Sequence, residues 1–248
     1  MEVRKLLYAT NLKEPTLDSF EGLLGIKEIG LEEIILLSGN PPEELKDRLS
    51  HHGINLRGVE GSGSLVSRIL DSVKREDVSL VVANLKREKR RFIRGSDARN
   101  IIKNTPLPLL LIKENSYPKK GIFDSVILAT DWSTVAQRAL NYMIGLKEII
   151  GVLDIVNVLN EKPTIRDIRQ LKERIEGIRK ICLEEKIDAE SHIYAGKTPE
   201  EILLAAKDYG ATVIVMGTGC KSTIKEIYSG SSSYRVAEKA PVPVLIIP

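Results

Sequence analysis

The sequence predicts an α/β protein made of two tandem units, each a doubly wound, five-stranded parallel sheet flanked by helices. Three observations lead to this prediction. An internal repeat runs through the chain, apolar β-branched segments alternate with amphipathic ones, and 248 residues are enough for two small domains.

The internal repeat joins segments 120 to 135 residues apart. LLYATN at 6–11 matches VILATD at 126–131, an offset of 120. Later matches have offsets of 133 and then 135. The rise from 120 to 133 means that 13 residues (133 minus 120) were gained or lost between the first match and the later ones. The later pairs are Gly63 with Gly196, Ile69 with Ile202, Asn84 with Gly217, Gly95 with Gly230, Ser96 with Ser231, Pro106 with Pro241 and Pro108 with Pro243. We therefore expect domains at 1–118 and 119–248, joined by the turn-forming segment NSYPKKG.

The second unit alternates strand and helix patterns, which favours a parallel sheet. We expect strands at 124–130, 151–159, 188–194, 213–217 and 244–247. We expect helices at 134–150, from about 163 to 182, from 198, and at 234–239. Ser133 should cap the first helix, and Pro199 suits the first turn of the third.

The second helix of this unit carries an apolar residue at every third or fourth position, which predicts a buried stripe. The stripe consists of Ile165, Ile168, Leu171, Ile175, Ile178 and Cys182. Cys182 is therefore expected in the core. With only one other cysteine, Cys220, neither a disulfide framework nor a structural metal site is expected.

The stretch from Val213 to Ile247 has the pattern of a site for a small anion. VIVM is typical of a strand buried on both faces, and it ends at Gly217. After a loop to Gly230, three serines precede the helix at 234–239. Because a helix N-terminus presents unpaired N–H groups and partial positive charge, it suits a phosphate.

Two better-known glycine motifs do not fit this stretch. A P-loop needs glycine where Cys220 and Val215 stand. The segment 217–222 has the pattern GxGxxS rather than GxGxxG, and it follows a late strand instead of opening a βαβ unit.

The spacing instead resembles the G-x2-G-x9-G-S/T loop of the ATP-binding branch of the universal stress protein family. The chain has Gly217, then Cys220 in place of the second glycine, then Gly230 and Ser231. The resemblance implies the strand order 3-2-1-4-5. It also implies that the two units pair through their last strands as a pseudo-dimer, which would bury two edge strands.

The resemblance also implies a site for ATP or AMP, with or without Mg²⁺, in the second unit. It places this site at the reversal of strand order, where strands 1 and 4 end. Asp131 would contact the ribose or order the loop, and Val158 would offer backbone groups to the adenine edge. The implied nucleotide-binding residues are Ala129, Thr130, Asp131, Val158, Met216, Gly217, Gly219, Cys220, Gly230, Ser231, Ser232 and Ser233. Two alternatives stay open: Asp131 as a helix N-cap, and the serines as caps only.

The first unit lacks most of these features. Asn11 replaces the acid, Asn84 replaces the first glycine, and the second helix, near 42–52, is far shorter. We therefore expect a scaffold that binds no nucleotide. Its loop at 86–94 holds six basic residues, either a patch for an acidic partner or a solvated loop, and we favour the solvated loop.

Composition narrows the class of function. The chain is 42% hydrophobic, has a formal charge of +3, and contains 4% aromatic residues, so a nucleic-acid partner is not expected. It has no long apolar run and no signal-peptide pattern, so we expect a cytoplasmic protein without a membrane partner. His51 and His52 are expected at the surface and His192 within a strand, with no metal cluster and no catalytic residues.

Three functions follow from this. The first is a nucleotide-responsive stress or regulatory protein that binds an adenine nucleotide in its second unit, forms a homo-oligomer of tandem chains and contacts an unidentified protein. The second is a partner-binding member of the family without a nucleotide site. The third is an ATP-consuming enzyme, for which at most slow hydrolysis is expected.

Overall fold

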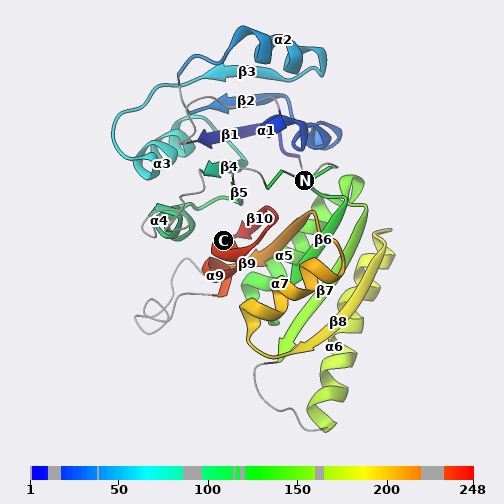
Figure 1. The fold of residues 1–248 in the computed structure, drawn as a ribbon. Coiled ribbons are helices and arrows are strands. Elements are labelled where there is room, and N and C mark those ends of the chain that lie inside the picture. The colour runs from blue at the N-terminus through cyan, green and yellow to red at the C-terminus, as the bar shows by residue number, and fades with distance from the viewer. Residues whose placement is uncertain are drawn as a thin grey trace.

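The computed structural model is an α/β fold in which one continuous ten-stranded sheet carries helices on both faces (Figure 1). It describes residues 2–10, 18–37, 39–85, 97–113, 116–117, 121–159, 165–218 and 232–248. The strands are β1 (Lys5–Thr10), β2 (Glu33–Leu36), β3 (Asn55–Gly58), β4 (Leu80–Leu85), β5 (Leu109–Lys113), β6 (Ser125–Ala129), β7 (Val152–Leu159), β8 (Ala189–Ala195), β9 (Val213–Gly217) and β10 (Val244–Ile247).

Both halves of the sheet have the same strand order. The sheet runs β3-β2-β1-β4-β5-β10-β9-β6-β7-β8, so each half reads 3-2-1-4-5 from its outer edge. Within each half all neighbouring strands are parallel. The predicted fold class and strand order are confirmed. The domain boundary stays a prediction, because residues 118–120 lie outside the described part of the chain.

The halves join through their last strands. β5 and β10 are antiparallel, with Leu110 opposite Leu245 and Leu111 opposite Val244. These apolar side chains are buried because both faces of the joint are covered. The pairing turns two edge strands into central ones, which is the physical motive expected for the pseudo-dimer.

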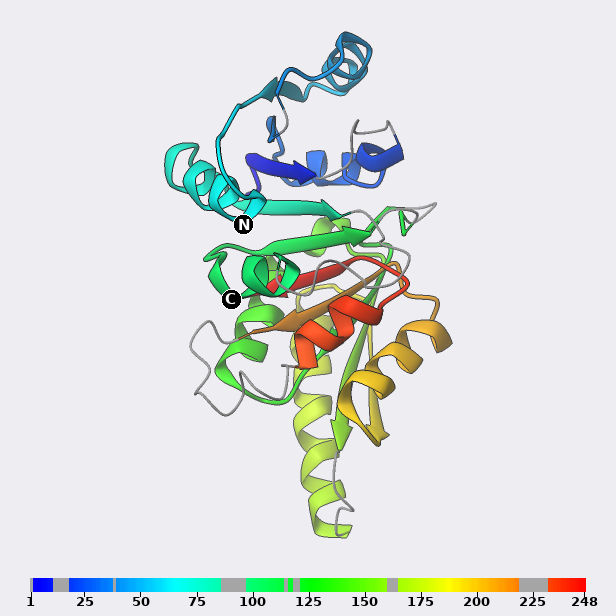
Figure 2. The same cartoon turned by 60° about the vertical axis from the view of Figure 1, so that its left-hand side comes forward.

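Helices cover the two faces in separate layers (Figure 2). One face is covered by α3 (Leu65–Arg75), α4 (Asp97–Asn104), α7 (Thr198–Asp208) and α9 (Ser232–Lys239). The other face is covered by α1 (Asp18–Glu21), η1 (Leu24–Ile29), α2 (Glu43–His51), α5 (Thr134–Gly145), η2 (Lys147–Ile149) and α6 (Ile165–Glu184). Each face has one hydrophobic cluster, and each cluster includes residues of both halves. The halves therefore share their cores as well as their sheet.

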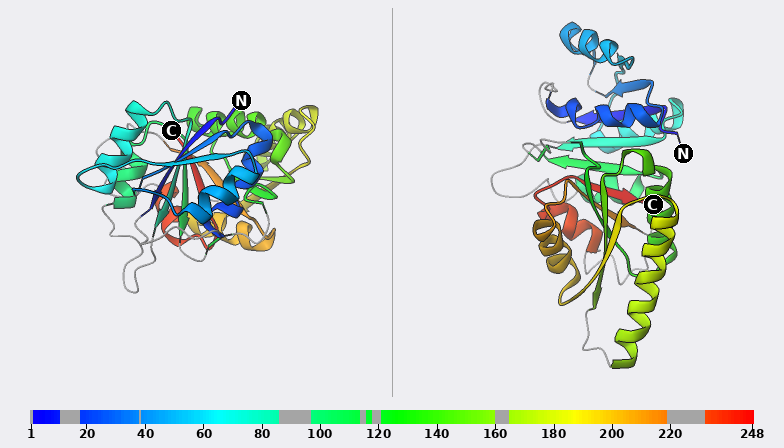
Figure 3. Two further views of the ribbon diagram at one scale, coloured as in Figure 1. Left: turned by 90° about the horizontal axis from the view of Figure 1, so that it is seen from above. Right: turned by 90° about the vertical axis from the view of Figure 1, so that its right-hand side faces the viewer.

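Two helix predictions need correction. The helix expected at 134–150 ends at Gly145, and a 3-10 turn, η2, follows. The stripe on α6 is buried only toward its C-terminal end: Ile175 and Cys182 are buried, whereas Ile168 is 36% exposed. The N-terminal end of α6 extends past the sheet (Figure 3), so Ile168 is covered less than Ile175.

Cys182 lies in the core as predicted. Its side chain is fully buried at the C-terminal end of α6. Burial raises the pKa of the Cys182 thiol to about 11, because the thiolate would lose its hydration. The thiol therefore acts as a small apolar group at neutral pH.

Candidate functional site

The carboxyl ends of β6 and β9 lie side by side in the second half, where the strand order reverses. Ala129 and Met216, near these two ends, are direct neighbours in the sheet. Asp131, two positions after Ala129, and Gly217, the last residue of β9, therefore lie at one edge of the sheet although 86 positions (217 minus 131) separate them. This arrangement confirms the predicted convergence of the two segments.

The turn from β6 into α5 is built by side chains that bind its own backbone. Thr130 Oγ1 accepts from the Trp132 N–H at 3.3 Å, and Asp131 Oδ1 accepts from the Ser133 N–H at 3.0 Å. Ser133 Oγ then accepts from the Ala136 N–H at 3.2 Å and caps α5, as predicted. Trp132 has φ 67, in the left-handed region, and these hydrogen bonds offset the cost of that conformation. Asp131 therefore orders the loop, and Ser133 is the N-cap.

Gly217 is packed directly against the first turn of α5. A Cβ atom on Gly217 would lie 2.5 Å from the carbonyl carbon and oxygen of Val135. No side chain fits there without moving the helix. The glycine thus has a packing role that brings the end of β9 against the N-terminus of α5.

The start of α9 lies at the same edge of the sheet. Ser233, buried in the first turn of α9, donates from its Oγ to Thr218 Oγ1 at 3.3 Å. Thr218 directly follows β9, and its N–H donates to the Ile247 carbonyl of β10. Because α5 begins beside Gly217 and α9 begins beside Thr218, two helix N-termini lie at this edge of the sheet, one on each face.

Val158, on the neighbouring strand, turns its backbone toward the same place. The Val156 carbonyl accepts from Thr130 on the β6 side, and the Leu159 carbonyl accepts from Gly196 on the β8 side. Since successive residues of a strand alternate between neighbours, the N–H and C=O of Val158 point to the β6 side. β6 ends at Ala129, so these groups lie beyond its end.

Asn157 supports this edge and was missed by the sequence analysis. Its Nδ2 donates to the Thr130 carbonyl at 2.7 Å, while its Oδ1 is buried and has no hydrogen-bond partner among the described residues. The available signal was a polar residue near the end of an otherwise apolar strand. Nothing in the sequence showed that its side chain would reach the loop after β6.

The structure brings most of the predicted site residues together. Ala129, Thr130, Asp131, Met216, Gly217, Ser232 and Ser233 lie at this edge of the sheet, with Val158 on the adjacent strand. The predicted residues Gly219, Cys220, Gly230 and Ser231 lie outside the described residues. The same holds for Asn11 and for the basic loop at 86–94.

The first half has a buried side chain at the position of Gly217. Asn84, at 0% exposure near the end of β4, donates from Nδ2 to the hydroxyl of Tyr8 at 2.6 Å. It also hydrogen-bonds to the hydroxyl of Tyr117, from the segment after β5. Side chains therefore fill the space that corresponds to the Gly217 contact in the second half.

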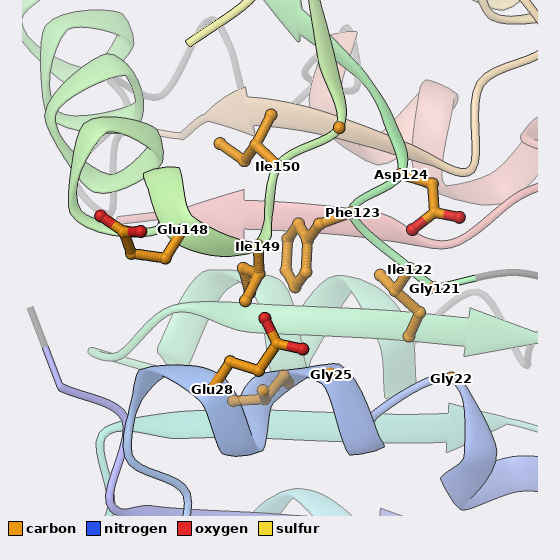
Figure 4. A pocket seen from close by; sticks show the side chains of 12 residues that line it. Gly22, Gly25, Glu28, Gly121, Ile122, Phe123, Asp124, Glu148, Ile149 and Ile150 are labelled. Atoms are coloured by element: carbon orange, nitrogen blue, oxygen red, sulfur yellow. The ribbon is translucent and has the colours of Figure 1, made fainter. Parts of the chain in front are cut away.

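A pocket of about 280 Å³ lies between the halves at the amino end of β6, away from the site just described (Figure 4). It is formed where η1 and η2 face each other. Its charged side chains are the carboxylates of Glu28, Asp124 and Glu148. Because like charges repel, this lining does not suit a phosphate.

A cluster of ligand-type side chains, also missed by the sequence analysis, lies on β7 and β8. The ligand atoms of Asp154, Glu190 and His192 are all within 4.8 Å of one another. Asp154 faces Glu190 directly across the two strands and His192 diagonally. No metal cluster was expected from the sequence, where 36 positions (190 minus 154) separate the two carboxylates.

Fold and site together define a doubly wound α/β protein whose second half presents two helix N-termini at the switch point. A family model described as the universal stress protein family matches residues 123–248, and the chain belongs to this family. Within the described residues, no helix has both the length and the apolarity needed to cross a bilayer.

The chain is also similar to individual proteins and solved structures. The chain is 22% identical to universal stress protein Slr1230 of Synechocystis sp., over 97% of this chain and 88% of that protein. A universal stress protein from Archaeoglobus fulgidus DSM 4304 has a similar fold, with a TM-score of 0.68, 22% identity and coverage of 98% and 95%. A structure of the universal stress protein from Archaeoglobus fulgidus in complex with dAMP matches 51% of this chain and 99% of that one, with 26% identity and a TM-score of 0.42.

Proposed function

We propose that this universal stress protein binds one adenine nucleotide, ATP or AMP, in its second half and responds to nucleotide occupancy as a stress or regulatory protein. The observation that carries this proposal is that α5 and α9 both begin at the edge of the sheet where β6 and β9 end. Two partial positive charges at a switch point favour an anionic ligand with a planar base.

The roles of the residues follow from their positions. The Val158 backbone would pair with the adenine edge, since its N–H and C=O point past the end of β6. The exposed carboxylate of Asp131 has a second oxygen that could accept from the ribose, while Oδ1 holds the loop. The loop glycines and Ser231 to Ser233 would hold the phosphates. A Mg²⁺ ion would be bound mainly through the phosphates.

A partner-binding role without a nucleotide is the second candidate. Cys220 places a side chain where the ATP-binding loop has glycine, and Gly217 is already explained by its packing on α5. In this case the second half would have kept its fold and lost the phosphate contacts. Binding of ATP to the purified chain separates the two candidates.

The test of the nucleotide proposal is calorimetry with ATP on three full-length chains. Asp131→Ala should weaken binding by about one to two orders of magnitude, because it removes polar contacts worth about 1 to 3 kcal/mol. Asn11→Ala, the matched change in the first unit, should leave the affinity unchanged. Absence of binding in the unmodified chain, or equal effects of the two substitutions, would refute the proposal.

A further inference from the structure

The cluster on β7 and β8 contains two carboxylates that, among the residues the structure describes, have no lysine or arginine partner. Asp154, with 6% of its side chain exposed, and Glu190 are paired across the strands. In the described part of the chain, their ion pairs are with His192 alone. Like charges directly opposite on adjacent strands are destabilising, and a buried carboxylate needs a compensating charge. The site therefore favours a cation.

The distances within the cluster suit a small metal ion. His192 Nε2 lies 2.8 Å from Asp154 Oδ1 and 4.0 Å from Glu190 Oε2. Ligand atoms around a tetrahedral Zn²⁺ lie about 3.4 Å apart, given bonds of about 2.0 to 2.2 Å. Shifts of less than about 1 Å would bring these two spacings to that value, and the ligand atoms of all three residues lie within 4.8 Å of one another. Glu190 can supply most of the movement, because 68% of its side chain is exposed.

The imidazole of His192 is held in place from its other side. Tyr209, at the C-terminal end of α7, stacks on the ring with centroids 4.2 Å apart. Its hydroxyl lies 3.0 Å from His192 Nδ1. Without metal, the Nε2–H of His192 donates to Asp154 Oδ1 at 2.8 Å. A bound metal ion would take the place of that proton on Nε2, and Nδ1–H would then donate to the Tyr209 hydroxyl. Metal-binding histidines are oriented by such a partner on the second nitrogen.

We propose that Asp154, Glu190 and His192 form a binding site for a divalent transition-metal ion of the Zn²⁺ type. One imidazole nitrogen and two carboxylate oxygens suit such an ion, with water as a fourth ligand on the exposed side of Glu190. Mg²⁺ and Ca²⁺ are less suited, because they prefer six or more oxygen ligands. The C-terminus of α7 adds partial negative charge nearby.

This site is separate from the proposed nucleotide site. Asp154 and Glu190 lie near the beginnings of β7 and β8, whereas the switch point lies at the carboxyl ends of β6 and β9. Bound metal would tie the edge strand β8 to β7 and to the end of α7. The proposal does not depend on nucleotide binding.

The experiment measures Zn²⁺ affinity of the full chain, first freed of metal, by competition with a chromophoric chelator, with Co²⁺ as a spectroscopic probe. The unmodified chain should bind one Zn²⁺ at this site, and Co²⁺ should give a visible spectrum of low coordination number. His192→Gln and Glu190→Gln should each weaken Zn²⁺ binding by at least about 10-fold. Tyr209→Phe, which keeps the stacked ring and loses the hydroxyl, should weaken it by about 10-fold.

Glu184→Gln is the matched control, since it removes an exposed carboxylate from α6 on the opposite face of the sheet. It should leave the affinity unchanged. Glu190 is exposed, so loss of binding in Glu190→Gln cannot be attributed to unfolding. Failure of the unmodified chain to bind Zn²⁺, or binding that survives both Glu190→Gln and His192→Gln, would overturn the proposal and leave a structural Asp154–His192 pair.

Discussion

At the scale of single residues, the site depends on a few positions that tolerate only one residue type, because of close backbone packing or a specific hydrogen bond. Gly217 is one of these, because the backbone of Val135 occupies the space of a Cβ. Asn157 is another, because its amide holds the carbonyl at the end of β6. Both act on the same edge of the sheet, from β9 and β7, the two strands that flank β6.

Gly217→Ala should reduce the free energy of unfolding by about 1 to 3 kcal/mol, the usual cost of forcing extra atoms into a packed contact. Gly177→Ala, within α6, is the control because nothing lies within 4 Å of its added Cβ. It should raise stability by up to about 1 kcal/mol, since alanine favours helix. Denaturant titration of both variants measures these changes. An unchanged free energy of unfolding in Gly217→Ala would contradict the packing role.

Cys182 should resist thiol reagents at pH 8 in the folded protein and react only after unfolding, because its pKa of about 11 keeps it protonated. Peptide mapping after alkylation measures this. Below pH 9.0, the ordinary pKa of a thiol, the contribution of the protonated Cys182 to stability is fully present. As the pH rises toward 11 this contribution is lost, because the unfolded chain ionises first. This fall in the free energy of unfolding at alkaline pH should be absent in Cys182→Ala. Labelling of Cys182 in the folded protein at pH 8 would contradict its burial.

Residue roles that depend on pairing between strands could not be predicted from the sequence. Asp131, Gly217 and Ser133 could be placed because a turn or cap pattern surrounds each of them. Asp154 and His192 could not, because only the register of β7 against β8 brings them together. Their polar character was visible, but the identity of their neighbours was not.

At the scale of elements, the two halves are also connected outside the sheet. Lys113, the last residue of β5, donates from Nζ to the carbonyls of Glu238 and Ala240 at 2.7 and 2.8 Å. It thereby caps the C-terminal end of α9 from the other half, where a positive charge is favourable. Arg99 of α4 adds a contact over the ring of Tyr234, with its guanidinium carbon 4.6 Å from the ring centroid.

Lys113→Met should lower the free energy of unfolding by about 1 to 3 kcal/mol, because two charge-assisted hydrogen bonds are lost. Lys103→Met, on the exposed side of α4, is the matched control and should change stability by less than about 0.5 kcal/mol. Chemical denaturation of both variants measures the difference. Equal stability of the two variants would show that the cap contributes nothing.

The helices and strands of the second half were predictable because capping residues, prolines and the spacing of apolar residues indicate the same elements there. Two details of the prediction were wrong, each for a physical reason. The helix from Thr134 gives way to a 3-10 turn after Gly145, since the turn brings η2 against η1 of the first half. The apolar stripe on α6 continues into the part of the helix that extends past the sheet. The spacing of apolar residues therefore overestimated the burial of the stripe.

At the scale of the whole molecule, the repeat in the sequence becomes a near-symmetric sheet with one altered half. The symmetry was predictable from matching segments and the family resemblance. The asymmetry has a structural counterpart: Asn84 is hydrogen-bonded to the hydroxyls of Tyr8 and Tyr117, whereas the second half has Gly217 at the position of Asn84 and Leu128 at the position of Tyr8. We therefore expect the first half to support the sheet and the second to bind the ligand.

The most direct test of the central proposal is the number of adenine nucleotides bound per full-length chain, measured by calorimetry with ATP and again with Gly230→Val. We predict one ATP per chain, and loss of binding in Gly230→Val because a valine side chain would enter the space of the phosphates. Two equivalent sites per chain, or one site that survives Gly230→Val, would contradict a single nucleotide held by the second half.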